Sequence, residues 1–494
     1  MPLGQRSAPA IVAGTREADV GRRAKTREHG RGRIIACRHR VHLDLGVLGE
    51  GVANPSGAQL RGEHVVGLVH DGDVERADES ACAFDEVLVT AVERGEPSGR
   101  HSARLGARHG RNDAGWPDDV PACGIMRAVS GLRVIVVGAG VYGLAAARRL
   151  ALAGADVTVL EAREAGGPYA ASAGSTRVLR FEYGPDAHYT ELVLRAREQW
   201  RELEGLLGES LYDETGLLWF AVEESRYLHD SVQTSLAAGL PVRLLEPAEA
   251  VRQFPAFSSE GIAAVLHDEA GGVLHARRAT LGLARLACAA GVVLREGTAV
   301  RAIAGGVVEL ADGSSERADQ VLVTTGAWTR ALVPAAPIRS TQQVNAYLRV
   351  ATAGLPVWIY DLDVYGLGDD GGAGLKVGGH AIGADVDPDD PAAREAPAAE
   401  VRRLADAARR RLPGLPWPDG EPPVRGADVC CYALTPTETA IVDRLDERTV
   451  LCAGFSGHGF KFAPALAAAA ADLVLGLEPS VSLAPFRRPE RSQA

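Results

Sequence analysis

Methionine is scarce in this 494-residue chain, and its only two copies, Met1 and Met126, enclose a segment of unusual composition. Residues 1–125 hold two of the 25 aromatic residues, no tyrosine, and one lysine against 16 arginines. So few large apolar side chains cannot readily offset the entropy lost when a backbone is ordered. The composition predicts that residues 1–125 form a poorly ordered extension, read through from upstream of Met126 as the natural start. A small independent domain of unknown role is the alternative.

Paired cysteines, long apolar runs and excess positive charge are also missing. The seven cysteines are odd in number and scattered without a CxxC pair, which argues against a disulfide framework or a zinc site. The longest apolar stretch, residues 463–477, is interrupted by Asp472 and falls short of the ~20 residues of a membrane span. Neither methionine is followed by a signal-peptide pattern. With a net charge of −11, the sequence predicts a soluble cytoplasmic protein without a metal, nucleic-acid or membrane partner.

A nucleotide-binding pattern begins at residue 133. An apolar run at Val134–Val137 leads into Gly138, Gly140 and Gly143, a helix-like segment follows, and a second apolar run ends in Glu161. The first glycine makes the turn, the second lets the backbone approach a pyrophosphate, and the third lets helix and strand pack closely. The acid is placed to accept hydrogen bonds from an adenosine ribose. The motif predicts a bound dinucleotide and leaves FAD and NAD both open.

The rest of the chain indicates two kinds of structure. Apolar residues at helical spacing predict a helix over 190–207, and strand patterns at 291–295, 307–310 and 320–324 are typical of a parallel α/β sheet. Residues 339–427 mix short strand candidates with glycine-, aspartate- and proline-rich loops. We therefore predict an α/β chain with a nucleotide-binding sheet of discontinuous segments and an inserted β-rich domain. The predicted boundaries are 126–210, 271–338 and 428–486 for the nucleotide-binding domain, and 211–270 and 339–427 for the substrate domain.

Six motifs occur in an order and spacing that resemble the monomeric sarcosine oxidase and N-methyltryptophan oxidase family of D-amino-acid-oxidase-like flavoproteins. They are Gly138–Gly143, Ser175–Arg180, Gly326–Trp328, Gly374–His380, Cys430–Pro436 and Gly454–Phe462. Taken alone, Gly326–Trp328 also fits a plain turn at a strand end. The resemblance covers about residues 133–486 and implies a Rossmann-like FAD-binding domain with an antiparallel, β-rich substrate domain.

The resemblance implies particular residues that hold FAD. Cys430 matches the cysteine that carries FAD through a thioether, while the adjacent Cys431 and non-covalent FAD remain alternatives. Arg177 matches a residue that serves the flavin, and a purely structural role is the alternative. The cofactor-binding residues implied in this way are Gly138, Gly140, Gly143, Glu161, Arg177, Val300, Cys430 and Gly457.

The resemblance also implies residues that act on the substrate. Arg180 and Lys461 match the pair that clamps the substrate carboxylate, a task suited to a guanidinium fork and a point charge. Lys376 matches the lysine that holds positive charge near the flavin and favours electron transfer to O₂. The other pocket positions, each of which also fits a structural role, are His380 and Tyr432 among the catalytic residues, and Tyr365 and His458 among the substrate-binding residues.

Two departures from the family pattern lie near the substrate side of the flavin. Residues 169–174 lack the histidine usual there, and residues 366–368 read Gly-Leu-Gly where Gly-Phe-Pro is usual. The resemblance implies a monomeric FAD-dependent oxidase of a secondary-amine α-amino acid, N-methylated or cyclic, which uses O₂ and yields an imine and H₂O₂. The alternatives are a tailoring oxidase of a cyclic imino acid, of pipecolate or piperideine-carboxylate type, and a flavin-binding protein without turnover.

Overall fold

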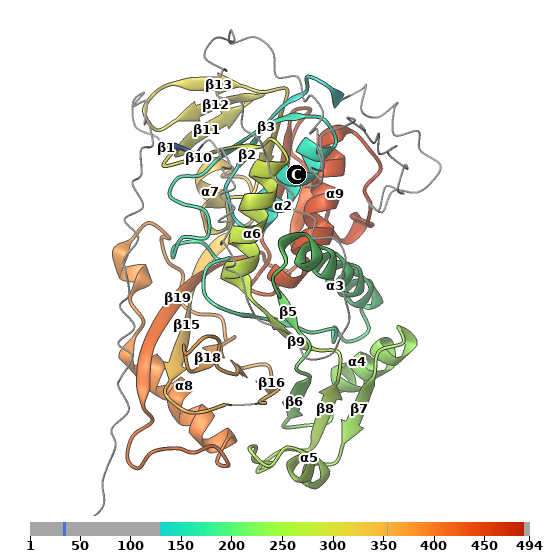
Figure 1. Ribbon diagram of the computed structural model, residues 1–494, viewed down its shortest axis with the longest axis vertical. Helices are drawn as coiled ribbons and strands as arrows, with labels where there is room; N and C mark the ends of the chain where they lie inside the picture. The colour runs from blue at the N-terminus through green and yellow to red at the C-terminus, as the bar shows by residue number, and fades with distance from the viewer. Residues whose placement is uncertain (1–32, 36–128, 353, 489–494) are drawn as a thin grey trace, which may run out of the picture. The chain divides into compact units, whose positions relative to one another are not determined.

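The computed structural model describes residues 33–35, 129–352 and 354–488, which belong to one compact unit of the chain (Figure 1). The predicted extension over residues 1–125 lies outside the described residues, apart from the short strand β1. The described part therefore contains the whole region in which the sequence analysis places its motifs.

A seven-stranded sheet carries the nucleotide-binding motif. The strand order is β1–β10–β3–β2–β14–β21–β20, with β10 to β21 parallel and the two edge strands antiparallel. Parallel strands are buried on both faces, which explains their continuous apolar runs. The strands are β1 (Arg33–Ile35), β2 (Arg133–Val137), β3 (Asp156–Leu160), β10 (Val293–Glu296), β14 (Gln320–Val323), β20 (Ile441–Arg444) and β21 (Thr449–Ala453).

Four helices share an apolar core with this sheet. They are α2 (Val141–Leu152), α3 (Ala187–Leu207), α6 (Ala276–Ala289) and α9 (Ala463–Leu475). Helix α9 is apolar on all sides and almost wholly buried, and its Asp472 pairs with Arg149 of α2 at 2.7 Å. Segments more than 300 residues apart thus complete one layer, which confirms the predicted α/β architecture of discontinuous segments.

One predicted strand belongs elsewhere. Strand β12 (Val307–Leu310) pairs antiparallel with β11 (Val300–Ala304) and β13 (Ser315–Arg317) in a separate three-stranded sheet. Gly305 and Gly306 both have positive φ, 56° and 81°, as a tight two-residue hairpin requires. The turn makes sequence neighbours pair locally, so the prediction that residues 307–310 join the parallel sheet is wrong.

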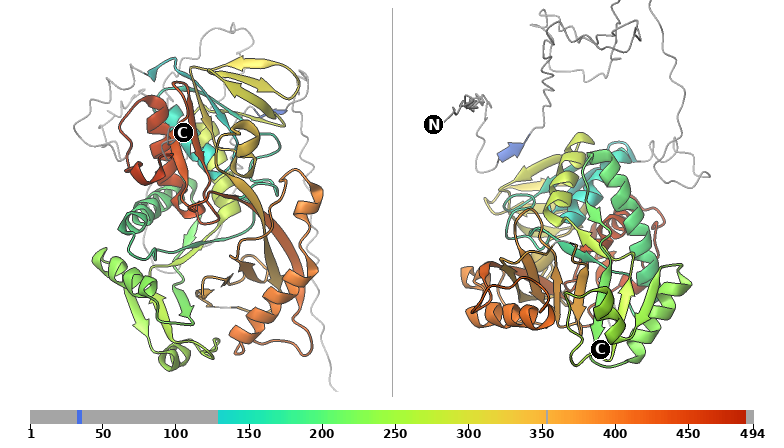
Figure 2. Two further views of the ribbon diagram at one scale, coloured as in Figure 1. Left: turned by 180° about the vertical axis from the view of Figure 1, so that it is seen from behind. Right: turned by 60° about the horizontal axis from the view of Figure 1, so that its bottom comes forward.

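An eight-stranded sheet of order β19–β15–β18–β17–β16–β6–β8–β7 forms the second layer, with only β16 and β6 parallel. Helix α8 (Ala398–Arg411) packs against β15, β17 and β18 (Figure 2). The strands are β6 (Leu217–Ala221), β7 (Val242–Leu245), β8 (Ala264–Asp268), β15 (Arg339–Leu348), β16 (Val357–Tyr360), β17 (Val364–Leu367), β18 (Leu375–Gly379) and β19 (Val424–Leu434). The predicted domain boundaries stay a prediction, and β19 crosses one of them.

Short elements connect these layers. Strands β4 (Arg177–Leu179), β9 (Gly272–Leu274) and β5 (Tyr212–Asp213) form a small antiparallel sheet. The remaining helices are α4 (Arg226–Ala237), α5 (Pro247–Gln253), α7 (Thr329–Leu332), η1 (Gly326–Trp328), η2 (Pro391–Arg394), η3 (Phe460–Phe462) and η4 (Ala484–Phe486). None of the helices in the described part of the chain has the length and apolar character needed to cross a bilayer.

Two helical glycines allow a matched test of this packing. A Cβ at Gly143 of α2 would overlap the Gly138 carbonyl oxygen, whereas a Cβ at Gly205 of α3 would meet no atom within 4 Å. We expect Gly143→Ala to lower the free energy of unfolding by about 1–3 kcal/mol, because the backbone must move. Gly205→Ala should raise it by about 0.5–1 kcal/mol, because alanine restricts the unfolded chain. Urea unfolding of both variants measures this, and equal effects would contradict the packing role of Gly143.

Candidate active site

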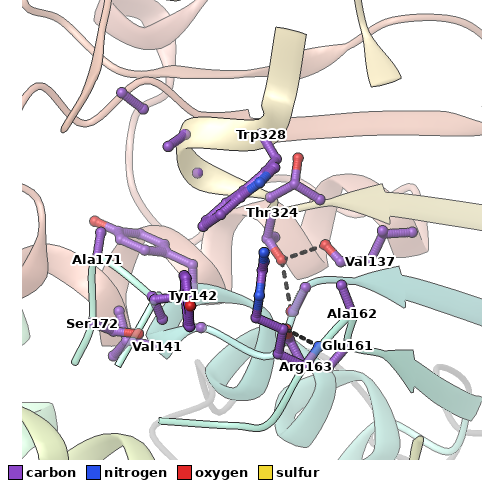
Figure 3. Close-up of a pocket in the computed structure, with 18 of the residues that line it drawn as sticks. Val137, Val141, Tyr142, Glu161, Ala162, Arg163, Ala171, Ser172, Thr324 and Trp328 are labelled. Carbon is purple, nitrogen blue, oxygen red and sulfur yellow. Dashed lines mark hydrogen bonds between the residues drawn. The ribbon is translucent and has the colours of Figure 1, made fainter. Parts of the chain in front are cut away.

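A cavity of about 730 Å³ lies at the carboxyl end of β2, where the glycine turn leads into α2 (Figure 3). Gly138 has φ of 103°, and a Cβ there would lie 2.8 Å from the backbone oxygen of Thr324, so glycine is required. Gly140 precedes α2 without a side-chain cap. The first N–H groups of the helix are therefore suited to an anion such as a pyrophosphate.

Glu161 forms part of the cavity wall just after β3. Its carboxylate accepts the backbone N–H groups of Ala139 at 2.8 Å and of Arg163 at 2.9 Å. These bonds fix the side chain, and the remaining lone pairs of the carboxylate can accept hydrogen bonds from the hydroxyl groups of a ribose. The Thr324 hydroxyl donates to the carbonyl oxygens of Val137 and Gly138, which holds the glycine turn from the opposite side (Figure 3).

The lining of this cavity fits a dinucleotide and contains all but one of the predicted cofactor-binding residues. These are Gly138, Gly140, Glu161, Arg177, Val300, Cys430 and Gly457. Gly143 does not line the cavity; it packs α2 against the turn instead. The glycine cradle and the fixed acid are the features that the adenosine diphosphate part of FAD requires.

Several cavity residues escaped the sequence analysis. The guanidinium carbon of Arg163 lies 4.3 Å from the ring centroid of Tyr169 and 5.2 Å from that of Trp328. Asp389 accepts the indole N–H of Trp328 at 2.9 Å and pairs with Arg163 at 3.0 Å. No local pattern marks Asp389, because its partners lie more than 60 residues away in sequence. Trp328, which the sequence left open between a cofactor motif and a plain turn, lines the cavity from η1.

A second cavity of about 90 Å³ adjoins the first. Five residues line both cavities: Arg177, Cys430, Tyr432, Gly457 and Phe460. The predicted substrate residues that line the second cavity are Arg180, Tyr365, His380, Tyr432, His458 and Lys461. The structure thus brings the predicted cofactor and substrate residues together around one segment of β19.

Two cations mark this second cavity: half-buried Arg180 and buried Lys461. The Arg180 guanidinium lies 4.4 Å from the ring centroid of Tyr183, and Lys461 Nζ lies 5.2 Å from the same centroid. Burial and the charge of Arg180 hold the pKa of Lys461 well below its ordinary value. An anion bound between the two cations would relieve this repulsion. Tyr183, which sequence analysis did not single out, supplies the aromatic face that both cations share.

The two cavity histidines carry no charge at neutral pH. Burial lowers the pKa of His458 to about 3, and the positive charge of Lys461 is the second cause. Burial lowers the pKa of His380 to about 4, and the positive charge of Arg180 is the second cause. The positive charge of this cavity is therefore confined to Arg177 and to the carboxylate clamp formed by Arg180 and Lys461.

A buried pair of carboxyl groups balances part of that charge. Asp268 and Glu182 are 0% and 1% exposed and lie close to each other. Burial and the neighbouring Glu182 raise the pKa of Asp268 to about 9, so Asp268 is protonated at neutral pH. The charge of Glu182 acts on both Arg180 and Lys461.

Lys376 occupies a different position from the other predicted catalytic residues. It is 2% exposed on β18, lines neither cavity, and its Nζ donates to the Thr176 carbonyl oxygen at 2.9 Å. Burial and the adjacent Arg177 lower the pKa of Lys376 to about 7. Its amine therefore titrates near neutral pH while its charge is felt by Cys430.

The adjacent cysteines of β19 lie in different surroundings. Cys430 lines both cavities, whereas Cys431 is 2% exposed and lines neither. Side chains alternate between the two faces of a strand, so only one of the pair can face the cavities. Burial raises the pKa of the Cys430 thiol, and the charge of Arg177 opposes this effect.

The profile of the FAD dependent oxidoreductase family, called DAO, matches residues 133–473. The chain belongs to this family. It is 30% identical to monomeric sarcosine oxidase of Bacillus sp. (strain B-0618) over 380 residues, 72% of this chain and 96% of that protein. It is also 30% identical to N-methyl-L-tryptophan oxidase of Salmonella agona (strain SL483) over 376 residues, 73% of this chain and 99% of that protein.

Solved structures share the fold at lower identity. L-proline dehydrogenase from P. horikoshii has a TM-score of 0.63 at 22% identity, covering 72% of this chain and 98% of that one. NikD, an amino acid oxidase essential for nikkomycin biosynthesis, has a TM-score of 0.62 at 24% identity, covering 73% and 98%. These findings confirm the predicted family and fold, and the chain is an FAD-dependent oxidoreductase.

Proposed function

We propose that the chain is an oxidase of an α-amino acid whose amine is secondary, either N-methylated or cyclic. The observation that carries the proposal is the junction of the two cavities at Cys430 and Tyr432: one fits a dinucleotide, and the other is lined by the cations Arg180 and Lys461. Two relatives are named for sarcosine and N-methyl-L-tryptophan, and each of these compounds has a carboxylate and a secondary amine.

The residues of the second cavity bind and orient the substrate. Arg180 and Lys461 hold the carboxylate, which fixes the C–H bond beside the amine toward the first cavity. Bound FAD would supply the redox chemistry of the site: a hydride from the C–H bond and a proton from the N–H group leave the amino acid to give an imine, and O₂ takes up the two electrons and two protons as H₂O₂. His380 and His458, neutral at pH 7, add no charge that would compete for the carboxylate.

Covalent attachment of FAD to Cys430 is part of the same proposal. The thiol lies at the junction of the cavities, while the thiol of Cys431 is buried away from both. The structure therefore favours Cys430 as the residue that carries the cofactor.

A cyclic imino acid is the second candidate substrate. The second cavity is about 90 Å³ and is lined on one side by Ile359, Leu362 and Val364. A compact ring fits so small an apolar space better than a long side chain. This observation favours a substrate of proline or pipecolate type, including the tailoring reaction in which such a ring is oxidised.

A screen for H₂O₂ formation by the flavin-loaded protein tests the proposed function. The panel contains sarcosine, other N-methyl amino acids, proline, pipecolate, and primary D- and L-amino acids. We expect at least one secondary amine to be oxidised with kcat/KM about tenfold or more above its matched primary amine. Activity on primary amines alone, or flavin reduction without H₂O₂, would refute the proposal; the ranking of N-methylated and cyclic substrates separates the two candidates.

The pKa of Lys376 predicts how reaction with O₂ depends on pH. The amine is positively charged below about pH 7 and loses its charge above it. Negative charge develops on O₂ as it is reduced, so the charged amine assists this step. Flavin reoxidation should therefore slow about tenfold or more as pH rises through 7, and Lys376→Met should be slow at every pH.

Anaerobic reduction by substrate is the control for that experiment, since the carboxylate clamp is unchanged. Stopped-flow absorbance follows both half-reactions, and we expect Lys376→Met to change the reductive one less than threefold. Equal losses in the two half-reactions would remove the assigned role of Lys376.

A further inference from the structure

A row of polar side chains crosses the eight-stranded sheet beside the second cavity. Asn345 of β15 lies opposite Asp428 of β19 on one side and Gly378 of β18 on the other, and Gly378 lies opposite Tyr365 of β17. A Cβ at Gly378 would lie 2.5 Å from the Tyr365 hydroxyl and 2.7 Å from Asn345 Oδ1. Glycine thus leaves a gap through which the Tyr365 hydroxyl reaches Asn345 Oδ1 at 3.1 Å.

One carboxylate fixes the direction of the hydrogen bonds in this row. Asp428 accepts the Asn345 amide N–H at 2.6 Å and the Tyr347 hydroxyl at 2.6 Å. An ionised carboxylate can only accept, so the amide nitrogen of Asn345 must face it and the amide oxygen must face Tyr365. The Tyr365 hydroxyl therefore donates to Asn345.

The surroundings keep this arrangement at neutral pH. The positive charges of Arg177 and Lys376 act on Asp428. Burial raises the pKa of Tyr365 to about 12 and that of Tyr432 well above its ordinary value, so both phenols stay protonated. Asn345 is 5% exposed, so water does not replace its partners.

We propose that Asp428 and Asn345 are positioning residues that direct the Tyr365 proton away from the second cavity and leave the Tyr365 oxygen as an acceptor there for a substrate N–H group. Tyr365 lines that cavity. The inference rests on the proposed function, in which Arg180 holds the carboxylate. It adds the residues that would select for an N–H group on the substrate amine.

The physical reason is the cost of an unpaired group. A tertiary amine that is neutral has no N–H, so it leaves a buried acceptor without a donor. Sites built to hydrogen-bond one substrate group discriminate strongly against analogues that lack it. Selection for the N–H group therefore comes from side chains on β15 and β19, outside the carboxylate clamp.

Two unreactive probes test this directly on the flavin-loaded protein. Pyrrole-2-carboxylate and furan-2-carboxylate share ring size and carboxylate, but only pyrrole has an N–H, and neither has a C–H bond at the carbon that bears the carboxylate. Isothermal titration calorimetry measures their dissociation constants. We expect the wild-type protein to bind the pyrrole about tenfold more tightly, the value of one hydrogen bond at a buried site.

Two variants separate Asp428 from its surroundings. Asp428→Asn keeps the size but can both donate and accept, so the row loses its fixed direction and the preference for pyrrole should fall to about twofold or less. Tyr347→Phe is the matched control: it removes one donor to Asp428 but leaves the direction unchanged, and the preference should remain about tenfold. The furan dissociation constant should change less than threefold in both variants, because the clamp is intact.

The binding results separate the inference from the proposed function. Equal affinity of the wild-type protein for the two rings overturns the inference without need of a variant, and an unchanged preference in Asp428→Asn overturns the role of Asp428. Failure of both rings to bind would contradict the carboxylate clamp, and with it the proposed function as well as the inference. Binding of both with equal affinity contradicts the inference alone.

Discussion

The register of β19 against β15 is the constraint on which the rest of the site depends. The two strands pair from Arg339 opposite Leu434 to Leu348 opposite Val424. Because side chains alternate along a strand, this register directs Cys430 and Tyr432 to the cavities and Cys431 away from them. A slip of one residue would reverse every side chain of β19, so a single ladder positions the thiol, the phenol and the carboxylate of Asp428 together.

Charge is distributed so that the second cavity needs an anion. Half-buried Arg180 and buried Lys461 supply positive charge, and the charge of the nearby Glu182 acts on both of them. Burial keeps the cavity histidines neutral. A substrate carboxylate completes the balance at one end of the cavity, while the Tyr365 oxygen offers an acceptor to its amine. Together these features describe a site for an amino acid rather than for a neutral amine.

Local patterns in the sequence were sufficient for the parts of the structure that depend on neighbours in the chain. The glycine turn and Glu161 follow from one βαβ unit, and the resemblance placed Arg180 and Lys461 at one cavity. Contacts between residues far apart in the sequence were not predictable: Asp428 meets Asn345 across 83 residues, and Asp389 reaches Trp328 across 61. The misplaced strand at residues 307–310 shows the same limit, since a hairpin turn overrode the alternation of helix and strand.

The most direct test of the account is the location of the flavin on the protein. The protein is precipitated with acid, washed, digested, and its flavin-bearing peptide is sequenced by mass spectrometry. The account predicts that the washed precipitate stays yellow and that the flavin is attached to Cys430, the thiol that faces both cavities. Flavin released entirely to the supernatant, or found on Cys431, would contradict the geometry on which the site is built.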